Sequence, residues 1–316
     1  MKVTVKTPAR LHLGLVDMNG DLGRLFGGLG VGIDRPNVIV EAQTAPDLKI
    51  TGKAVQKAAE TADRFFAAYK VPKKVHLNVL EAIPCHVGLG SGTQLSIAVA
   101  VALAKVLNVN ASVPELATAV GRAKRTSVGT SIFQYGGFVV DGGKNLKTQA
   151  VPPLIYRQPF PKEWRFIVAI PTQPKGLSNS EENHAFDKLK PQSAEVVGQI
   201  SRLIMYKLLP SLAERDIEAF GDALTKIQVI IGNQFAQAQG GTYSSQACGD
   251  CIEFMKQNGA HGVGQSSWGP ALYAVVKQEE AKALLGKVKA YLRSGVGGEA
   301  FIAKANNKGA SIKVEA

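Results

Sequence analysis

The sequence predicts an α+β protein with two lobes. Strand patterns come first, and mixed helix and strand patterns follow without the regular alternation of a doubly wound sheet. A proline-rich stretch, Ala150 to Trp164, separates the halves. At 316 residues and 45% hydrophobic content, each half is long enough for its own core. We therefore expect lobes over residues 1–155 and 156–316.

The first elements are extended. "KVTVKTPARLHLG" predicts two strands separated by a break at Pro8, with Arg10 and His12 on the face opposite Leu11 and Leu13. "GDLGRLFGGLGVGI" has six glycines and predicts a loop whose bare backbone can approach a ligand. A strand (38–42), a helix (53–69) and a strand (75–79) follow.

The middle of the chain contains a glycine turn between a strand end and a long apolar helix, in "EAIPCHVGLGSGTQLSIAVAVALAKVLN". Ser112-Val-Pro-Glu115 is typical of a capping box and predicts a helix to Lys124. The later elements are predicted to be strands over 138–141, 165–170 and 301–304, helices over 194–209, 216–231, 243–258 and 279–294, and a second glycine turn entering a strand within 262–276.

Composition excludes several classes of protein. The longest apolar run, Ile97 to Ala104, is far shorter than the roughly 20 residues of a membrane span. The basic N-terminus lacks the apolar centre of a secretion signal, so we expect a cytoplasmic protein. Cys85, Cys248 and Cys251 do not form a disulfide framework, and ordinary helix residues are favoured over zinc or redox roles for the last two.

The formal net charge of +12 indicates an anionic partner or a basic solvated surface. The basic residues are scattered, with only short clusters such as Arg122-Ala-Lys124-Arg125, and no basic and aromatic stripe is visible. We therefore expect a highly anionic small substrate and no nucleic acid.

The first glycine turn predicts a phosphate site. A helix N-terminus presents unpaired backbone N–H groups and a partial positive charge. Gly88, Gly90 and Gly92 would let a ligand come close, Leu89 lies between them, and Ser91, Thr93 and Gln94 add polar groups. The spacing matches neither the dinucleotide fingerprint nor a P-loop. The alternative is a turn that only admits a tightly packed helix.

Three motifs resemble the GHMP superfamily of small-molecule kinases over nearly the whole chain. They are "PARLHLG" (8–14), "PCHVGLGSG" (84–92) and "GVGQSSWGP" (262–270). The resemblance implies an N-terminal lobe like ribosomal protein S5, a ferredoxin-like C-terminal lobe, and substrate in the cleft between them. GHMP kinases with a catalytic base have an Asp seven residues before a Gly-Gly pair, where this chain has Gly129.

Three stretches differ from the kinases and resemble the β-ribofuranosylaminobenzene 5'-phosphate synthase family: "HLGLVDMNGDLGRLFGGLGVGID", "SVGTSIFQYGGFVVDGG" and "GVGQSSWGP". That resemblance implies condensation of 4-aminobenzoate, or 4-hydroxybenzoate in some members, with phosphoribosyl pyrophosphate. Carbon dioxide and pyrophosphate are released, Mg²⁺ takes part, and the pathway is tetrahydromethanopterin biosynthesis. Because loss of carbon dioxide restores the aromatic ring, the reaction needs no strong base.

On this reading Arg10, His12 and Asp17 are the catalytic candidates, and Asp17 with Asp21 is the Mg²⁺ candidate. The alternative for the two aspartates is turn chemistry, which Asp-x-Asn-Gly suits. Arg10 and His12 are expected to bind the carboxylate or the 5'-phosphate. The substrate-binding candidates are Gly88, Leu89, Gly90, Ser91, Gly92, Thr93, Gln94, Arg122, Arg125, Gln265, Ser266, Ser267 and Trp268.

Some roles keep alternatives. Arg122 and Arg125 either assist the pyrophosphate site or end a solvated helix. Trp268 either stacks on the aromatic ring or anchors packing. Glu181, Glu182 and His184 either close over the substrate or begin a helix.

Two other functions remain open. One is a GHMP-type kinase that phosphorylates a small alcohol with ATP, and the other is a catalytically silent ligand-binding or nucleic-acid-binding protein. We expect a homodimer. The preferred aromatic acid and the metal ligands are not determined by the sequence.

Overall fold

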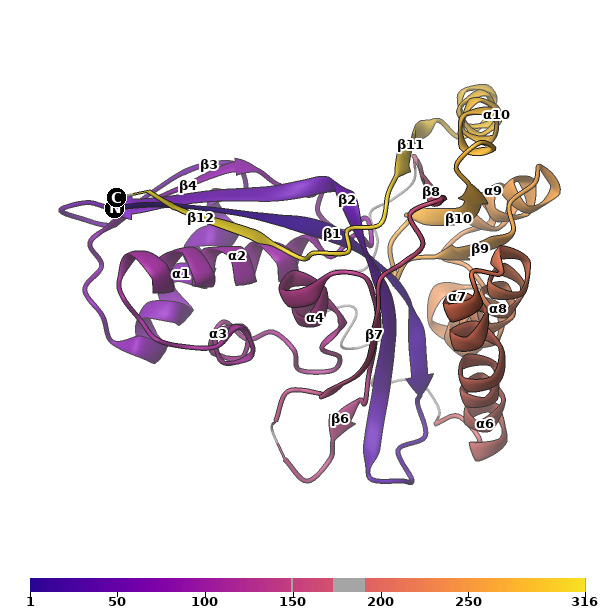
Figure 1. Cartoon of the computed structure of the whole chain (residues 1–316), viewed down its shortest axis with the longest axis horizontal. Coiled ribbons are helices and arrows are strands. Elements are labelled where there is room, and N and C mark those ends of the chain that lie inside the picture. The colour runs from indigo at the N-terminus through magenta and orange to yellow at the C-terminus, as the bar shows by residue number, and fades with distance from the viewer. Residues whose placement is uncertain (149, 173–190, 316) are drawn as a thin grey trace.

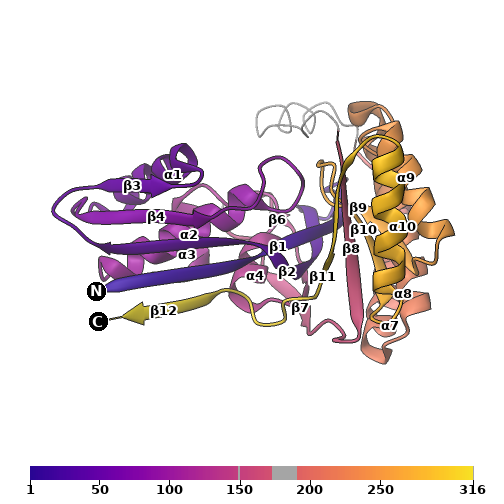
Figure 2. The ribbon, with the colours of Figure 1, turned by 90° about the horizontal axis from the view of Figure 1, so that it is seen from above.

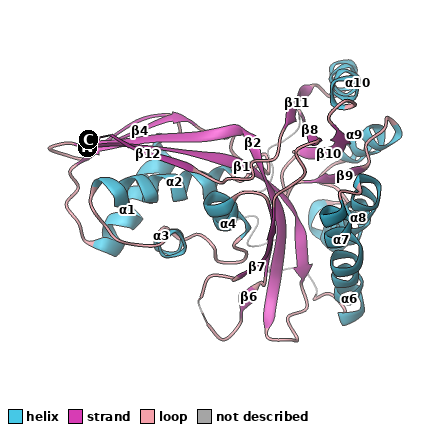
Figure 3. Ribbon diagram, viewed as in Figure 1, coloured by secondary structure: helices cyan, strands magenta, loops and turns pink. Residues whose placement is uncertain are grey.

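The computed structural model describes residues 1–148, 150–172 and 191–315. It contains two lobes, each with its own sheet (Figure 1), and this confirms the predicted α+β class. Helices and strands alternate irregularly along the chain, as the sequence pattern indicated (Figure 3).

The first lobe is a twisted sheet with helices on one face (Figure 3). Its central strand order is β12-β1-β2-β4-β3, and β5 pairs with β2 and β7. The strands are β1 (Lys2–Asp17), β2 (Arg24–Thr44), β3 (Lys49–Gly52), β4 (Val75–Glu81), β5 (Phe138–Asp141), β6 (Lys144–Asn145), β7 (Leu154–Gln158) and β12 (Ser311–Glu315). The helices are α1 (Val55–Tyr69), α2 (Ser91–Val106), α3 (Val113–Ala119) and α4 (Val128–Tyr135).

The predicted break at Pro8 is wrong, because β1 is continuous. Pro8 coincides with a register shift against β2. Strand β12 pairs with β1 only from Lys2 to Lys6. Proline has no backbone N–H, and at Pro8 strand β12 no longer lies beside β1 to accept a hydrogen bond.

The predicted glycine loop over 20–33 is also wrong in large part, because residues from Arg24 onward belong to β2. A Cβ built at Gly28 or Gly30 would lie 2.6 or 2.4 Å from a methyl group of Val128 in α4. The bare backbone of β2 thus lets a helix pack closely against the sheet. Close packing of α4, and not the approach of a ligand, explains Gly28 and Gly30.

The capping box before α3 is confirmed. Ser112 accepts the backbone N–H of Glu115, and the Glu115 carboxylate accepts the backbone N–H of Ser112. The helix ends at Ala119 and not at Lys124, because Gly121 takes a left-handed conformation with φ of 76°.

The second lobe is a four-stranded antiparallel sheet in the order β11-β8-β10-β9. Helices α9 (Gln246–Gln257) and α10 (Ala281–Ser294) cover the face of this sheet away from the first lobe (Figure 2). Helix α8 (Ile217–Gln239) bonds to the edge strand at 262–265 and contacts the first lobe through Phe220 and Gln228. The strands are β8 (Trp164–Pro171), β9 (Gly262–Gln265), β10 (Leu272–Lys277) and β11 (Gly298–Ala303). The helices are α6 (Ala194–Leu203), the π-helical turn η1 (Ile204–Leu208), α7 (Leu209–Glu214), α8 (Ile217–Gln239), α9 (Gln246–Gln257) and α10 (Ala281–Ser294).

Cys248 and Cys251 lie in α9 as buried thiols of the core between the second sheet and helices α9 and α10. Burial raises the pKa of the Cys251 thiol to about 12, so it stays protonated. Within the described ranges, no helix is long and apolar enough to cross a bilayer.

Among the described residues, one crossing between the lobes leads from β7 into β8 and another follows β11. After β11 the chain returns to the first lobe, where β12 pairs antiparallel with β1 and brings the two chain ends together (Figure 2). The predicted division at residue 155 did not include this return strand.

Candidate active site

Helix α2 begins directly after the glycine turn and has no capping side chain. Gly90 is its N-cap, with φ of 81°, a left-handed conformation that glycine adopts without strain. The backbone N–H groups of its first turn, at Ser91, Gly92 and Thr93, have no acceptor within the helix. Almost every later side chain of α2 is buried, so these donors are held rigidly. This end of α2 is therefore built to receive an anion.

Two arginines flank this helix end. A Cβ built at Gly90 would lie 2.8 Å from Cγ of Arg10, and one built at Gly92 would lie 3.2 Å from Nη2 of Arg122. Arg10 Nη1 donates to the carbonyl of Gly88 at 2.7 Å, and Arg122 Nε donates to Ser96 Oγ at 3.2 Å. The two guanidinium groups are thus fixed beside the helix dipole and add positive charge to it.

Gly88 forms a joint between the lobes. A Cβ at this position would lie 2.2 Å from the carbonyl oxygen of Ser266 in the second lobe. Ser266 Oγ donates to the Gly88 carbonyl at 2.7 Å and accepts the backbone N–H of His12 at 3.0 Å. Ser266 is fully buried, so this hydroxyl joins the lobes and is not exposed to a ligand.

The rest of the "GQSSWGP" turn is also mostly buried. The Gln265 side chain accepts the backbone N–H of Ser244 at 2.8 Å and donates to the Ser267 carbonyl at 3.1 Å. Trp268 meets the ring of Phe235 edge to face, with centroids 4.6 Å apart. The structure places Trp268 as a packing anchor. Ser267 is partly exposed, and its N–H donates to the His12 carbonyl at 3.3 Å.

Two residues of the predicted phosphate loop point into the core. Gln94 is fully buried, accepts a hydrogen bond from Thr7 Oγ1, and donates to the Gly129 carbonyl at 2.9 Å. Leu89 is buried, and its carbonyl accepts the backbone N–H of Arg10 at 3.1 Å. Both residues position the turn. The Gln94 amide is bonded within the core, so it does not make the expected contact with a ligand.

His12 lies beside Arg10 on β1 and is 9% exposed. Burial, and then the nearby positive charge of Arg10, lower the pKa of His12 to about 3. The imidazole is therefore neutral at pH 7 and can donate or accept one hydrogen bond. Of His12 and Arg10, only Arg10 carries a positive charge that attracts an anion.

Asp17 and Asp21 lie at the tip of the β1–β2 hairpin. Asp17 Oδ1 accepts the backbone N–H groups of Asn19 and Gly20 at 2.7 and 2.9 Å, which is the turn chemistry of the alternative interpretation. Asp17 lies five positions after His12 along β1, which corresponds to roughly 16 Å at about 3.3 Å per residue. In the described part of the chain, no group of three or more His, Cys, Asp or Glu residues could hold a metal ion. Asp17 thus acts as a turn residue, and the Mg²⁺ role of these two aspartates stays a prediction.

Sequence reasoning missed Asp141 at the end of β5. Its buried carboxylate accepts four backbone N–H groups, from Ser127 at 2.7 Å, Gly143 at 2.9 Å, and Gly28 and Val128 at 3.1 Å each. Burial raises its pKa to about 6, while the hydrogen bonds act in the opposite direction. A lone acidic residue closing an apolar strand before Gly-Gly was the signal that could have identified it.

Gly129 occupies the position where GHMP kinases with a catalytic base have an Asp. A Cβ there would lie 2.7 Å from Thr93 Cγ2, so α2 and α4 leave no room for a side chain. Arg125 lies partly buried in the same loop as Arg122. Glu181, Glu182 and His184 lie outside the described residues.

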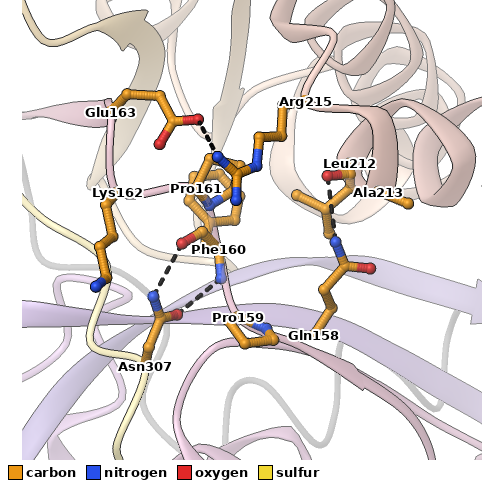
Figure 4. Close-up of a pocket in the computed structure, with 10 residues that line it drawn as sticks. All are labelled: Gln158, Pro159, Phe160, Pro161, Lys162, Glu163, Leu212, Ala213, Arg215 and Asn307. Carbon is orange, nitrogen blue, oxygen red and sulfur yellow. Dashed lines mark hydrogen bonds and ion pairs between the residues drawn. The ribbon is translucent and has the colours of Figure 1, made fainter.

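Figure 4 shows a hollow of about 340 Å³ that contains none of the predicted site residues. It lies where both crossings between the lobes pass, and Asn307 closes it by pairing with the backbone N–H and carbonyl of Phe160 at 2.7 and 2.9 Å (Figure 4). Arg215 pairs with Glu163 at its rim, at 3.4 Å. The rigid anion-binding geometry is at α2, so we place the candidate active site there.

The fold defines the class of protein. The family described as GHMP kinases N terminal domain matches residues 53–137, and GHMP kinases C terminal matches residues 208–294. Solved structures of the same fold include mevalonate kinase from Methanococcus jannaschii, at 16% identity and a TM-score of 0.70 over 96% of this chain and 98% of that one. Galactokinase from Lactococcus lactis, complexed with galactose, has 15% identity and a TM-score of 0.71 over 98% and 95%. The chain therefore has the GHMP kinase fold.

Closer relatives specify the family. Beta-ribofuranosylphenol 5'-phosphate synthase from Methanothermobacter thermautotrophicus is 33% identical over 300 residues, which cover 88% of this chain and 90% of that protein. The protein of the same name from Archaeoglobus fulgidus is 31% identical over 98% of this chain and 99% of its own length. The chain belongs to the beta-ribofuranosylphenol 5'-phosphate synthase family, as the sequence motifs predicted.

Proposed function

We propose that this enzyme condenses phosphoribosyl pyrophosphate with 4-hydroxybenzoate or 4-aminobenzoate in tetrahydromethanopterin biosynthesis. The products are a C-riboside 5'-phosphate, carbon dioxide and pyrophosphate. The relatives are named for a ribofuranosylphenol, which favours 4-hydroxybenzoate as the acceptor. The observation that supports the proposal most is the uncapped N-terminus of α2 between Arg10 and Arg122.

The proposed reaction balances without a base to remove a proton. The bond between the sugar C1 and the pyrophosphate oxygen breaks, and its electron pair leaves with pyrophosphate. The ring carbon that bears the carboxylate forms a bond to C1. The electrons of the ring–carboxylate bond then restore aromaticity as carbon dioxide leaves. No ring proton has to be removed, which agrees with the absence of space for a side chain at Gly129.

The residues at the site act on the leaving group. Negative charge grows on the departing pyrophosphate, and the α2 N–H groups with Arg10 and Arg122 are already oriented towards that charge. Donors of this kind contribute most when they need no reorganisation during the reaction. Neutral His12 can orient the sugar or the carboxylate by a hydrogen bond without adding charge.

Mg²⁺ stays a prediction. This ion is often held in phosphate-transfer sites mainly by substrate phosphates and water. The described residues add no cluster of carboxylates to such a site, and no step of the proposed chemistry depends on it. The homodimer also stays a prediction, to be checked by light scattering.

Labelled substrate tests the proposal. Enzyme is incubated with carboxyl-¹⁴C 4-hydroxybenzoate or 4-aminobenzoate and either phosphoribosyl pyrophosphate or ATP. We expect release of ¹⁴CO₂ that requires phosphoribosyl pyrophosphate. ATP-dependent phosphorylation of a small alcohol without such release would support the kinase and contradict the synthase.

A further inference from the structure

A second hollow, of about 430 Å³, lies between the lobes beside the glycine turn. This volume is within the range of small-molecule sites. Among the described residues that line it, most are apolar, one has a hydroxyl, one has a carboxylate, and none is Lys or Arg. The lining residues include Val87, Ile170, Pro171, Thr172, Pro270 and Glu299.

This hollow adjoins the anion site. Val87 directly precedes Gly88, and its carbonyl accepts the backbone N–H of Ala271 at 2.9 Å within the joint between the lobes. The Gly88 carbonyl holds Arg10 Nη1, while the stem of Arg10 packs over Gly90 at the start of α2. Arg10 is therefore bonded to the residue that follows Val87 and lies against the start of α2.

Glu299 faces the first lobe. It pairs directly with Ile170 across β11 and β8, so the two side chains share one face of the sheet. Phe166, Val168 and Ile170 on that face belong to the core that continues into the first lobe, whereas Ile167 belongs to the separate core under α9 and α10. Glu299 thus places a carboxylate at the end of an apolar face between the lobes.

We propose that this hollow receives the aromatic acceptor, with Glu299 accepting a hydrogen bond from its 4-hydroxyl or 4-amino group. The inference rests on the proposed function and specifies the acceptor subsite. Val87, Ile170 and the two prolines contact the ring, and the carboxylate of the acceptor lies towards Arg10. A fully anionic sugar phosphate does not suit this hollow, because the one charged residue among its described lining is acidic.

The contact has a chemical consequence. The 4-substituent is para to the carbon that attacks the sugar. A hydrogen bond from the 4-hydroxyl to a carboxylate shifts electron density into the ring and makes that carbon more nucleophilic. Glu299 therefore selects acceptors with a donor at position 4 and activates them, and no proton has to leave the complex.

Equilibrium binding to the full chain tests the subsite. Dissociation constants are measured for 4-hydroxybenzoate and for benzoate, which lacks the donor. We expect wild type to prefer 4-hydroxybenzoate by about 10-fold or more, the scale of a hydrogen bond to a charged group. Glu299→Ala should bring the ratio near one, and Glu299→Gln, which keeps an acceptor, should retain part of it. Glu279→Ala, an exposed glutamate of the same lobe, is the matched control.

The outcomes separate the two proposals. An unchanged ratio in Glu299→Ala, or no preference in wild type, overturns the subsite. Absence of labelled carbon dioxide from wild type overturns the proposed function, whereas the binding ratio requires no turnover. Val87→Phe, which fills the hollow, should weaken binding of both acids about 10-fold and leave phosphoribosyl pyrophosphate binding unchanged. Equal weakening of all three ligands would contradict the placement.

Discussion

The N-termini of α2 and α4 adjoin in the same lobe but have opposite electrostatic surroundings. The first turn of α4 donates to the Asp141 carboxylate, an anion supplied by the chain itself. The first turn of α2 has no capping side chain and lies between two guanidinium groups. The same backbone geometry thus closes the fold at α4 and leaves a candidate ligand site at α2. The neighbouring charges decide which of these occurs.

The largest effect is expected at Arg10. Arg10→Met keeps the apolar stem over Gly90 and removes the charge beside α2. We expect kcat/KM for phosphoribosyl pyrophosphate to fall about 100-fold or more, a usual result of losing one donor to a developing anion. Steady-state kinetics measure this, with Arg202→Met on α6 as the control. A loss below about threefold would show that α2 is not the leaving-group site.

Asp141→Asn makes the two helix ends more alike. The amide NH₂ would face backbone N–H donors that now meet a carboxylate oxygen, so we expect a loss of about 3 kcal/mol in the free energy of unfolding. Urea titration measures the loss. Unchanged stability would mean that the four hydrogen bonds of Asp141 contribute nothing net to closing α4.

The pH dependence of stability separates His12 from Asp141. The pKa of His12 is about 3 when folded and near its usual 6.5 when unfolded, so the unfolded chain binds a proton first as pH falls. This stability is fully present above pH 6.5 and is lost below it, by up to about 1.4 kcal/mol per pH unit. Asp141 acts with the opposite sign between pH 6 and its usual value of 3.8, because the folded chain protonates it first.

The free energy of unfolding of wild type minus that of His12→Asn does not contain the Asp141 contribution, because Asp141 is present in both proteins. We expect the free energy of unfolding of wild type, relative to the variant, to fall between pH 6.5 and 5.5. The exposed His86 provides the control variant His86→Asn, which should follow wild type. A parallel pH profile in His12→Asn would contradict the lowered pKa.

The smallest effect distinguishes the two serines of the second glycine turn. Ser266→Ala removes the hydroxyl that bonds both Gly88 and His12, and we expect a loss of about 1–2 kcal/mol in stability. Ser267→Ala should cost about 0.5 kcal/mol or less, because its side chain is partly exposed. Thermal unfolding compares them, and equal losses would contradict the assignment of the joint to Ser266.

Features that depend on neighbours in the chain were predictable. The start of α2 after the glycine turn, the capping box at Ser112 and the strand Phe138–Asp141 depend on local hydrogen bonds and periodicity. The sequence named Arg122 as an aid to the pyrophosphate site, but it named Arg10 only as a partner of His12 for the carboxylate or the 5'-phosphate, and the structure places Arg10 beside α2. The motifs further indicated the family, which the relatives then showed.

Sequence by itself determined the order of the elements, the start of a buried helix at the first glycine turn and the absence of a kinase base at Gly129. The tertiary structure alone decided that Gly28 and Gly30 admit a helix, that Ser266 and Trp268 are buried in the joint, and that Asp141 closes α4. The reason is physical. Local patterns report contacts within a few residues, whereas burial and charge at a joint depend on segments more than 100 residues apart, such as His12 and Ser266.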